Sequence, residues 1–160
     1  MIKKVLLYAF LALLVVTVVD LWRGKDLPAG PLPKQQWQSL QYQAVDIVER
    51  SYQEPVIVYF WGTWCPVCSV ITPSVDWLAG YLPVVSVAMT SGTDAELRRY
   101  LVQNDYQLAV INDPQAAISK QWGVAVTPAF AIVSNGEVQS FTAGPTTPLG
   151  LYARWLWAHW

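Results

Sequence analysis

Short apolar runs and amphipathic segments alternate along most of this chain. Runs rich in β-branched and aromatic residues are typical of buried strands, because these side chains suit a pleated, enclosed backbone. The runs that predict strands cover 55–61, 83–90 and 107–113. The segments that predict helices cover 65–82, 94–104, 114–123 and 147–160.

Two further strands are predicted on either side of the dipeptide Asn135–Gly136. Asn-Gly between alternating segments favours a two-residue turn, because both residues accept a positive φ. We therefore expect a hairpin over 128–144. Strand–helix alternation followed by a hairpin and a last helix predicts one α/β domain, in which helices flank a mixed central sheet.

The first 22 residues have a different pattern. Lys3 and Lys4 precede an uninterrupted, largely apolar run over 5–19. A helix of about 20 residues crosses a bilayer, so 1–22 predicts a transmembrane anchor whose two lysines keep the N-terminus in the cytoplasm. A cleaved signal peptide is the alternative, but no Ala-x-Ala-like step follows Val19. The remainder of the chain is expected to be exported.

Residues 23–36 contain two glycines and three prolines and show no apolar period. They predict an extended stalk of at most ~45 Å, at ~3.3 Å per residue, and leave 37–160 as the folded domain. A hydrophobic content of 54% and a mean hydropathy of +0.29 fit a chain that contacts lipid. A net charge of −1 without clustered basic residues excludes a nucleic-acid-binding face.

The only two cysteines, Cys65 and Cys68, follow the predicted strand at 55–61. At the start of the next helix, Cys65 would face free backbone N–H groups and the positive end of the helix dipole, which stabilise a thiolate. Cys68 lies one turn later, within reach of a mixed disulfide on Cys65. This placement predicts a redox-active pair that works without a bound cofactor.

Two other roles for the pair stay open. As a structural bridge it would remove little unfolded-chain entropy, because the loop it closes is very short. Zinc sites use three or four protein ligands. The only histidine is His159, near the end of the sequence, so a zinc site of Cys65, Cys68 and His159 would need a very long reach. Two thiolates suit copper(I), so copper(I) binding or delivery through Cys65 and Cys68 is the second hypothesis for this chain.

Three stretches of the sequence resemble the thioredoxin superfamily. They are VIVYFWGTWCPVC, GVAVTPAF and NGEVQSFTAG. Within the superfamily they look most like the membrane-anchored bacterial thiol–disulfide oxidoreductases of the TlpA-like group, which includes the suppressor-of-copper-sensitivity protein D type. The resemblance covers about 37–160 and implies a thioredoxin fold and protein disulfide oxidoreductase activity.

The resemblance also implies roles for single residues. Cys65 would be the exposed nucleophile and Cys68 the resolving thiol. Thr127–Pro128 matches the family's cis-proline loop, which contacts the bound substrate chain and keeps metal away from the thiols. The substrate-binding residues implied in this way are Trp64, Pro66, Val67, Thr127 and Pro128, with no metal ligand among the site residues.

Two positions depart from relatives that have a buried carboxylate near the cysteines. Tyr59 stands where thioredoxin has an aspartate, and Ile71 where the cytochrome-c-maturation reductases have a glutamate. Such a carboxylate accepts the proton of the resolving thiol, so its absence predicts another acceptor or slow deprotonation of Cys68. Val67 offers no hydrogen bond or charge to a Cys65 thiolate, which predicts an intermediate or reducing potential.

Two segments outside the motif have open interpretations. The C-terminal ARWLWAHW contains three tryptophans and is expected to pack on the sheet as a last helix, with contact to a membrane or partner as the alternative. Residues 91–113 coincide with the family's helix–strand insertion and could shape the choice of partner.

Together these features predict a single-pass bacterial inner-membrane protein with a periplasmic catalytic domain. Its partners would be thiols and disulfides of periplasmic proteins and a membrane electron donor, with this chain on the reducing or electron-relay side. The resemblance also implies a setting in copper tolerance.

Overall fold

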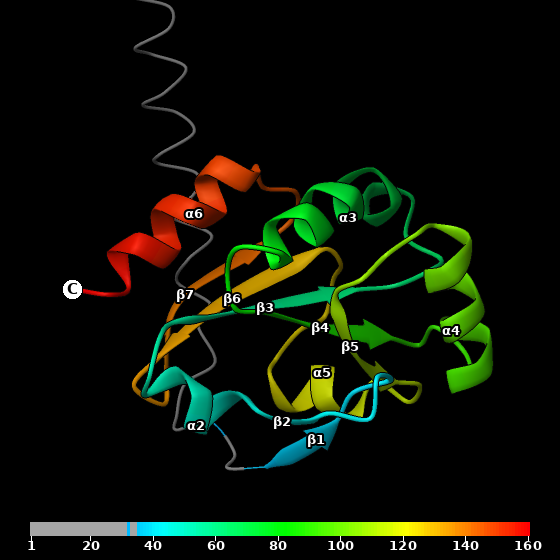
Figure 1. The fold of residues 1–160 in the computed structure, drawn as a ribbon, viewed down its shortest axis with the longest axis horizontal. Coiled ribbons are helices and arrows are strands. Elements are labelled where there is room, and N and C mark those ends of the chain that lie inside the picture. Colours follow the sequence, from blue (N-terminus) through cyan, green and yellow to red (C-terminus); the bar gives the residue numbers. More distant parts are fainter. Residues whose placement is uncertain (1–31, 33–34) are drawn as a thin grey trace, which may run out of the picture.

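A five-stranded mixed sheet organises the part of the chain that the computed structural model describes, which is Leu32 and residues 35–160. Its strands are β3 (Val56–Trp61), β4 (Val84–Met89), β5 (Ala109–Asp113), β6 (Ala129–Ser134) and β7 (Glu137–Ala143). They lie in the order β5-β4-β3-β6-β7, with β3 parallel to β4 and antiparallel to β6 (Figure 1). The mixed sheet and its five strands confirm the predicted α/β fold. The predicted anchor at 1–22 lies outside the described residues.

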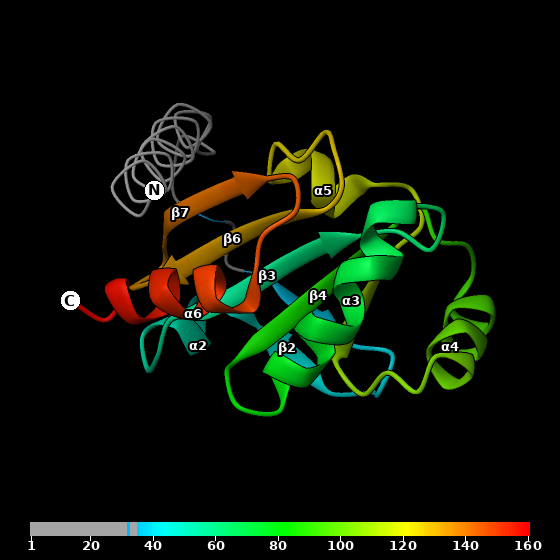
Figure 2. The same cartoon turned by 90° about the horizontal axis from the view of Figure 1, so that it is seen from above.

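Helices cover both faces of this sheet. They are α2 (Ile47–Ser51), α3 (Pro66–Ala79), α4 (Asp94–Gln103), α5 (Ala117–Gln121) and α6 (Pro148–Trp157). Helices α3 and α6 lie on one face, whereas α2, α5 and a small antiparallel sheet of β1 (Gln36–Gln38) and β2 (Ala44–Asp46) lie on the other (Figures 1 and 2). Helix α4 stands at one side of the domain (Figure 2) and contributes Leu97 and Leu101 to the same core as α3.

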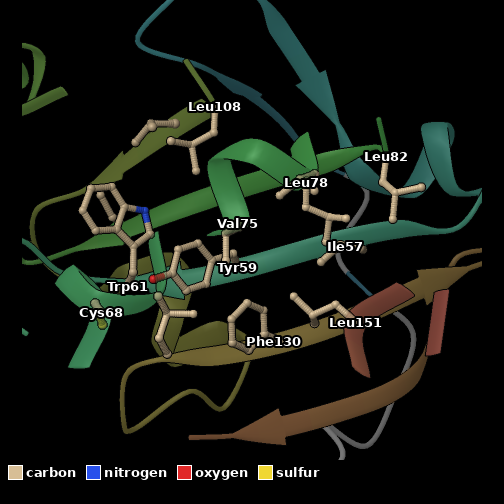
Figure 3. Packing of buried hydrophobic residues seen from close by; sticks show 14 of the residues in the cluster. Ile57, Tyr59, Trp61, Cys68, Val75, Leu78, Leu82, Leu108, Phe130 and Leu151 are labelled. Carbon is tan, nitrogen blue, oxygen red and sulfur yellow. The ribbon is translucent and has the colours of Figure 1, made fainter. Parts of the chain in front are cut away.

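Strand β3 separates two hydrophobic cores, because successive side chains of a strand point to opposite faces. All six of its side chains are fully buried. The core under α3 and α6 receives Ile57, Tyr59 and Trp61 (Figure 3). The core under α2 and α5 receives Val56, Val58 and Phe60.

The ends of several elements follow from local sequence chemistry. Thr93 caps α4 in a capping box with Glu96. Asn135 and Gly136 have φ values of 54° and 79°, so they form the predicted hairpin turn between β6 and β7. Thr147 caps α6, and Pro148 occupies its first turn.

The segment 36–54 is where the sequence pattern predicted least. It forms β1, β2 and α2, which have three, three and five residues. Elements this short carry too few apolar positions to show a period. Leu32, within the predicted stalk, is buried against the same core as Trp37 and Val45. None of the helices in the described part of the chain is long and apolar enough to span a membrane.

Candidate active site

Cys65 and Cys68 form a disulfide at the point where β3 leads into α3. Cys65 is the N-cap residue of α3, and the backbone N–H of Cys68 donates to its Sγ over 3.1 Å. Pro66 occupies the first turn of the helix, where a backbone N–H is not needed. The positive end of the α3 dipole therefore faces Cys65, the arrangement that favours a thiolate at this sulfur.

Both sulfurs are enclosed in this disulfide-bonded state. Cys65 is 4% exposed and Cys68 is fully buried. The expectation that Cys65 is exposed is therefore wrong for the oxidised protein. The cause is the loop before β6, whose Thr127 carbonyl oxygen lies 3.7 Å from Cys65 Sγ. A partner would have to approach Cys65 between this loop and the start of α3.

The loop before β6 contains a cis peptide bond between Thr127 and Pro128. It brings Thr127 beside Cys65, although 62 positions separate them in the sequence. The carbonyl of Pro128 accepts a hydrogen bond of 2.7 Å from the N–H of Gly144, which ties the loop to the end of β7. The loop therefore lies beside the first cysteine, and the substrate-binding role that the family resemblance implies for Thr127 and Pro128 stays a prediction.

Trp64, Pro66 and Val67 form the exposed rim of the disulfide. The indole N–H of Trp64 lies 3.0 Å from both the Met89 carbonyl and the Thr90 hydroxyl oxygen, although 53% of its surface is exposed. Gly62 permits this position, because a Cβ there would lie 2.6 Å from Trp64 Nε1. These contacts hold the exposed Trp64 side chain in one position beside the disulfide.

The hydroxyls of Tyr59 and Thr72 form a buried pair next to Cys68. The sequence analysis singled out only position 59, as one that lacks a carboxylate. Thr72 Oγ1 donates to the Cys68 carbonyl over 2.7 Å and lies 2.9 Å from the hydroxyl of Tyr59. A threonine has one hydroxyl proton, so Tyr59 must be the donor to Thr72. Burial raises the pKa of Tyr59 well above its ordinary value, so this hydroxyl keeps its proton. The signal for Thr72 was its position one turn after Cys68.

Ile71, at the second position where relatives have a carboxylate, packs in the core with Cys68. Figure 3 shows Tyr59 of β3 beside Phe130 of β6, with Cys68 at the same end of the core; the two rings stack at 4.8 Å. The groups packed in this core around Cys68 are thus aromatic, aliphatic or hydroxyl-bearing. This part of the site supplies neutral hydrogen bonds where a carboxylate would supply a base.

An open groove of about 530 Å³ begins at Trp64 and runs along α4. Its other walls are the loop after β4 and the side chains of Glu96, Arg99, Tyr100 and Gln103. Most of the residues that line the groove belong to the segment 91–113, which was expected to shape the choice of partner. It provides a surface beside the disulfide that a bound polypeptide can contact.

The metal-binding capacity of the described residues is small. Within Leu32 and 35–160, no three side chains of His, Cys, Asp or Glu come together as a metal site. Copper(I) would have to use the two thiolates of Cys65 and Cys68 after reduction of their disulfide.

Comparisons with known proteins place the chain among thiol-redox proteins. The Redoxin family profile matches residues 27–148. A thioredoxin-like protein of Haemophilus influenzae is 36% identical over 163 residues, covering 98% of this chain and 96% of the relative. A homolog of the thiol:disulfide interchange protein DsbE from Paracoccus denitrificans is 30% identical over 104 residues, covering 63% and 58%. The crystal structure of StoA from Bacillus subtilis has the same fold, with a TM-score of 0.70, 18% identity, and coverage of 79% and 98%.

Proposed function

This chain belongs to the Redoxin family as a thioredoxin-like protein disulfide oxidoreductase of the TlpA/DsbE type, and we propose that Cys65 and Cys68 carry its exchange reaction. The observation that supports this assignment most strongly is the position of Cys65. Its sulfur is capped by the Cys68 N–H and lies beside the Thr127 carbonyl. The Cys68 N–H would stabilise the thiolate form of Cys65, which is the nucleophile. The Thr127 carbonyl would give a bound substrate chain a backbone hydrogen-bond partner near the sulfur.

In the proposed reaction, the reduced protein transfers two electrons to a partner disulfide. The Cys65 thiolate attacks one partner sulfur, forming a mixed disulfide and releasing the other as a thiolate. The Cys68 thiolate then attacks Cys65 Sγ, which breaks the mixed disulfide and releases the second partner sulfur. The partner ends as a dithiol after taking up two protons, and this chain ends with the Cys65–Cys68 disulfide.

The residues around the disulfide would bind the partner chain. Thr127, whose carbonyl oxygen lies 3.7 Å from Cys65 Sγ, would offer backbone groups to an extended segment, and the adjacent Pro128 would contact the same segment. Trp64, Pro66 and Val67, next to the cysteines in the sequence, offer exposed surface. These residues support a shallow binding site for a polypeptide. Cys65 lies at the N-terminal end of α3, so a partner would not need a deep cavity to reach its sulfur.

We further assign the domain to the periplasmic side of the bacterial inner membrane, with 1–22 as its anchor. The apolar run at 5–19 and the preceding lysines support this topology. A membrane electron donor would then re-reduce the Cys65–Cys68 disulfide. Val67 adds no charge or hydrogen bond near the sulfurs, which supports a reducing or electron-relay role over that of a strong oxidant.

Trapping of partners tests this function. In a Cys68→Ala variant the second step cannot occur, so mixed disulfides on Cys65 should accumulate in cells and disappear on reduction. A Cys65→Ser/Cys68→Ala variant is the matched control and should trap nothing. Absence of adducts together with tight copper(I) binding by the reduced protein would contradict the proposal and favour copper handling.

The direction of electron flow has its own test. Equilibration of the Cys65–Cys68 pair with glutathione redox buffers gives its potential. A value near or below about −200 mV fits a reductant or relay, whereas a value near the −120 mV of strong disulfide-introducing oxidases would contradict this direction.

A further inference from the structure

Large apolar side chains are exposed mainly on two helices that cover the same face of the sheet (Figures 1 and 2). Fourteen large hydrophobic side chains are exposed among the described residues. Four lie on α3 or the turn after it and five on α6 or the turn after it, which makes nine of the fourteen. Clusters of this kind usually mark a contact surface. We call the most exposed of them, Val70, Trp77, Tyr81, Leu149, Trp157 and Trp160, the aromatic face.

The exposure of these side chains results from firmly placed helices. In α3, Val75 and Leu78 are buried against the sheet, whereas Trp77 is 61% exposed and stacks on Tyr81 with ring centroids 5.1 Å apart. In α6, Leu151 is buried and the indole N–H of Trp155 donates to the Pro55 carbonyl over 2.7 Å. The side of each helix that faces the sheet is therefore held by packing and hydrogen bonds, and the opposite side faces away from the domain.

The segments that form the aromatic face have few charged side chains and almost no carboxylates. Between 66 and 82 the only charged side chain is Asp76, whose carboxylate already accepts the N–H groups of Gln107 and Leu108 at 2.7 Å. Between 145 and 160 there is no Asp or Glu, and the basic side chains are Arg154 and His159. A surface of tryptophan and tyrosine without free carboxylates suits the interface of a bilayer, where aromatic side chains concentrate and anionic lipids repel acids.

The chain before the domain points to the same occupant. The proposed anchor ends at residue 22, and the described domain begins at Leu32 and Gln35. Because Leu32 is already buried in the domain, the nine residues 23–31 set the length of the tether, at most ~30 Å when fully extended. A domain tethered so closely meets lipid at a high effective concentration, so even a modest aromatic surface is expected to contact it.

We propose that the aromatic face lies on the lipid–water interface of the membrane in which the chain is anchored. This step rests on the proposed anchor. Trp77 lies twelve residues after Cys65, about 18 Å along α3 at 1.5 Å per residue. The disulfide would therefore stand at the border of the contact, open to a partner, while the far end of α3 and the outer side of α6 meet lipid.

Fluorine NMR of the full chain in lipid nanodiscs tests the contact. The nine tryptophans are labelled as 5-fluorotryptophan, assigned by single Trp→Phe variants, and exposed to a lipid that carries a paramagnetic headgroup. The lines of Trp77, Trp157 and Trp160 should broaden, and those of the buried Trp61 and Trp122 should stay sharp. Trp64 is exposed but lies outside the aromatic face, so its line should also stay sharp.

Variants measure how much the face contributes. A Trp157→Ser/Trp160→Ser variant should lower the ratio of lipid-contacting to free domain, as reported by Trp77, about tenfold or more, because burial of one large apolar side chain changes this equilibrium constant by at least that factor. Val102→Ser, which alters an equally exposed side chain on α4, is the matched control and should leave the ratio unchanged. Retained disulfide exchange in both variants shows that they are folded.

Three outcomes would overturn the proposal. Broadening of the Trp22 line alone would support the anchor but contradict contact between the aromatic face and lipid. Sharp lines for Trp22 and for the tryptophans of the aromatic face would contradict both the proposed anchor and the proposed lipid contact. Broadening that depends on protein concentration and not on the paramagnetic lipid would assign the face to a second copy of this chain.

Discussion

The two faces of β3 bury side chains equally well but use buried polar groups differently. On the disulfide side, the Tyr59 hydroxyl donates to the Thr72 hydroxyl, which in turn donates to the carbonyl of Cys68. On the opposite side, the buried polar groups serve the backbone: Asp113 accepts the N–H groups of Ile118 and Ser119 and the Ser119 hydroxyl.

This difference has a physical reason. Helices α2 and α5 have five residues each, too short to be stable through helix propensity alone. The Ser51 hydroxyl, like Asp113, accepts a buried N–H, that of Gly136. Buried polar groups therefore hold short helices in place on one side of β3. On the other side they form a neutral hydrogen-bonded pair that ends on the Cys68 carbonyl.

The largest effect is expected from the apolar core opposite the disulfide. Phe60→Ala removes a fully buried ring that packs on Trp122 at 5.5 Å and should lower the free energy of unfolding by about 3–5 kcal/mol. Urea unfolding measures this loss. The potential of the disulfide should stay within about 30 mV of the parent, which corresponds to ~1.4 kcal/mol. A larger change in potential would show that the two cores do not act separately.

A smaller loss is expected where buried polarity fastens a helix. Asp113→Ala leaves the donors of Ile118 and Ser119 without their acceptor and should cost about 2–3 kcal/mol of unfolding free energy. Hydrogen exchange should also become faster in α5 before it does in α3. Glu137→Ala, an exposed carboxylate on β7, is the control, and an equal loss in that variant would contradict the role of Asp113.

Alkaline pH should lower the stability of the domain through Tyr59, a group on the disulfide side of β3. The pKa of Tyr59 is raised by burial, so above about pH 10 the unfolded chain releases this proton while the folded chain keeps it. Stability from this group is complete below pH 10 and falls above it, by up to about 1.4 kcal/mol per pH unit. Unfolding measured between pH 9 and 11 should show a shallower fall in Tyr59→Phe, while Tyr42→Phe, an exposed control, should match the parent.

Most of the fold could be predicted from period and turn chemistry. The runs of β3 and β4, the Asn135–Gly136 turn and the two-residue spacing of the cysteines are local signals, and the structure follows them. The strands β1 and β2 could not be predicted, because with three residues each they depend on tertiary contacts such as the burial of Trp37.

The candidate site was predictable only in part. Cys65, Cys68 and Thr127–Pro128 carry a sequence motif, and the structure brings them together. The enclosure of Cys65 and the partnership of Tyr59 with Thr72 depend on how β3, α3 and the loop before β6 pack. Pairwise contacts between distant segments leave no mark in the spacing of residues, so the sequence showed a missing carboxylate but not what replaces it.

The smallest effect, and the sharpest test of the comparison, is expected from Tyr59→Phe at neutral pH. Loss of one buried hydrogen bond should cost about 1 kcal/mol of unfolding free energy. Tyr59 donates to the Thr72 hydroxyl, and Thr72 donates to the Cys68 carbonyl and not to the Cys68 sulfur. We therefore expect the pH midpoint for release of a partner from Cys65, followed by stopped-flow with a mixed-disulfide substrate, to stay unchanged. A shifted midpoint would show that Tyr59 acts on the Cys68 thiol itself, so that the hydroxyl pair takes part in proton transfer. Thr72→Val, which removes the hydroxyl nearer to Cys68, would then have to shift it further.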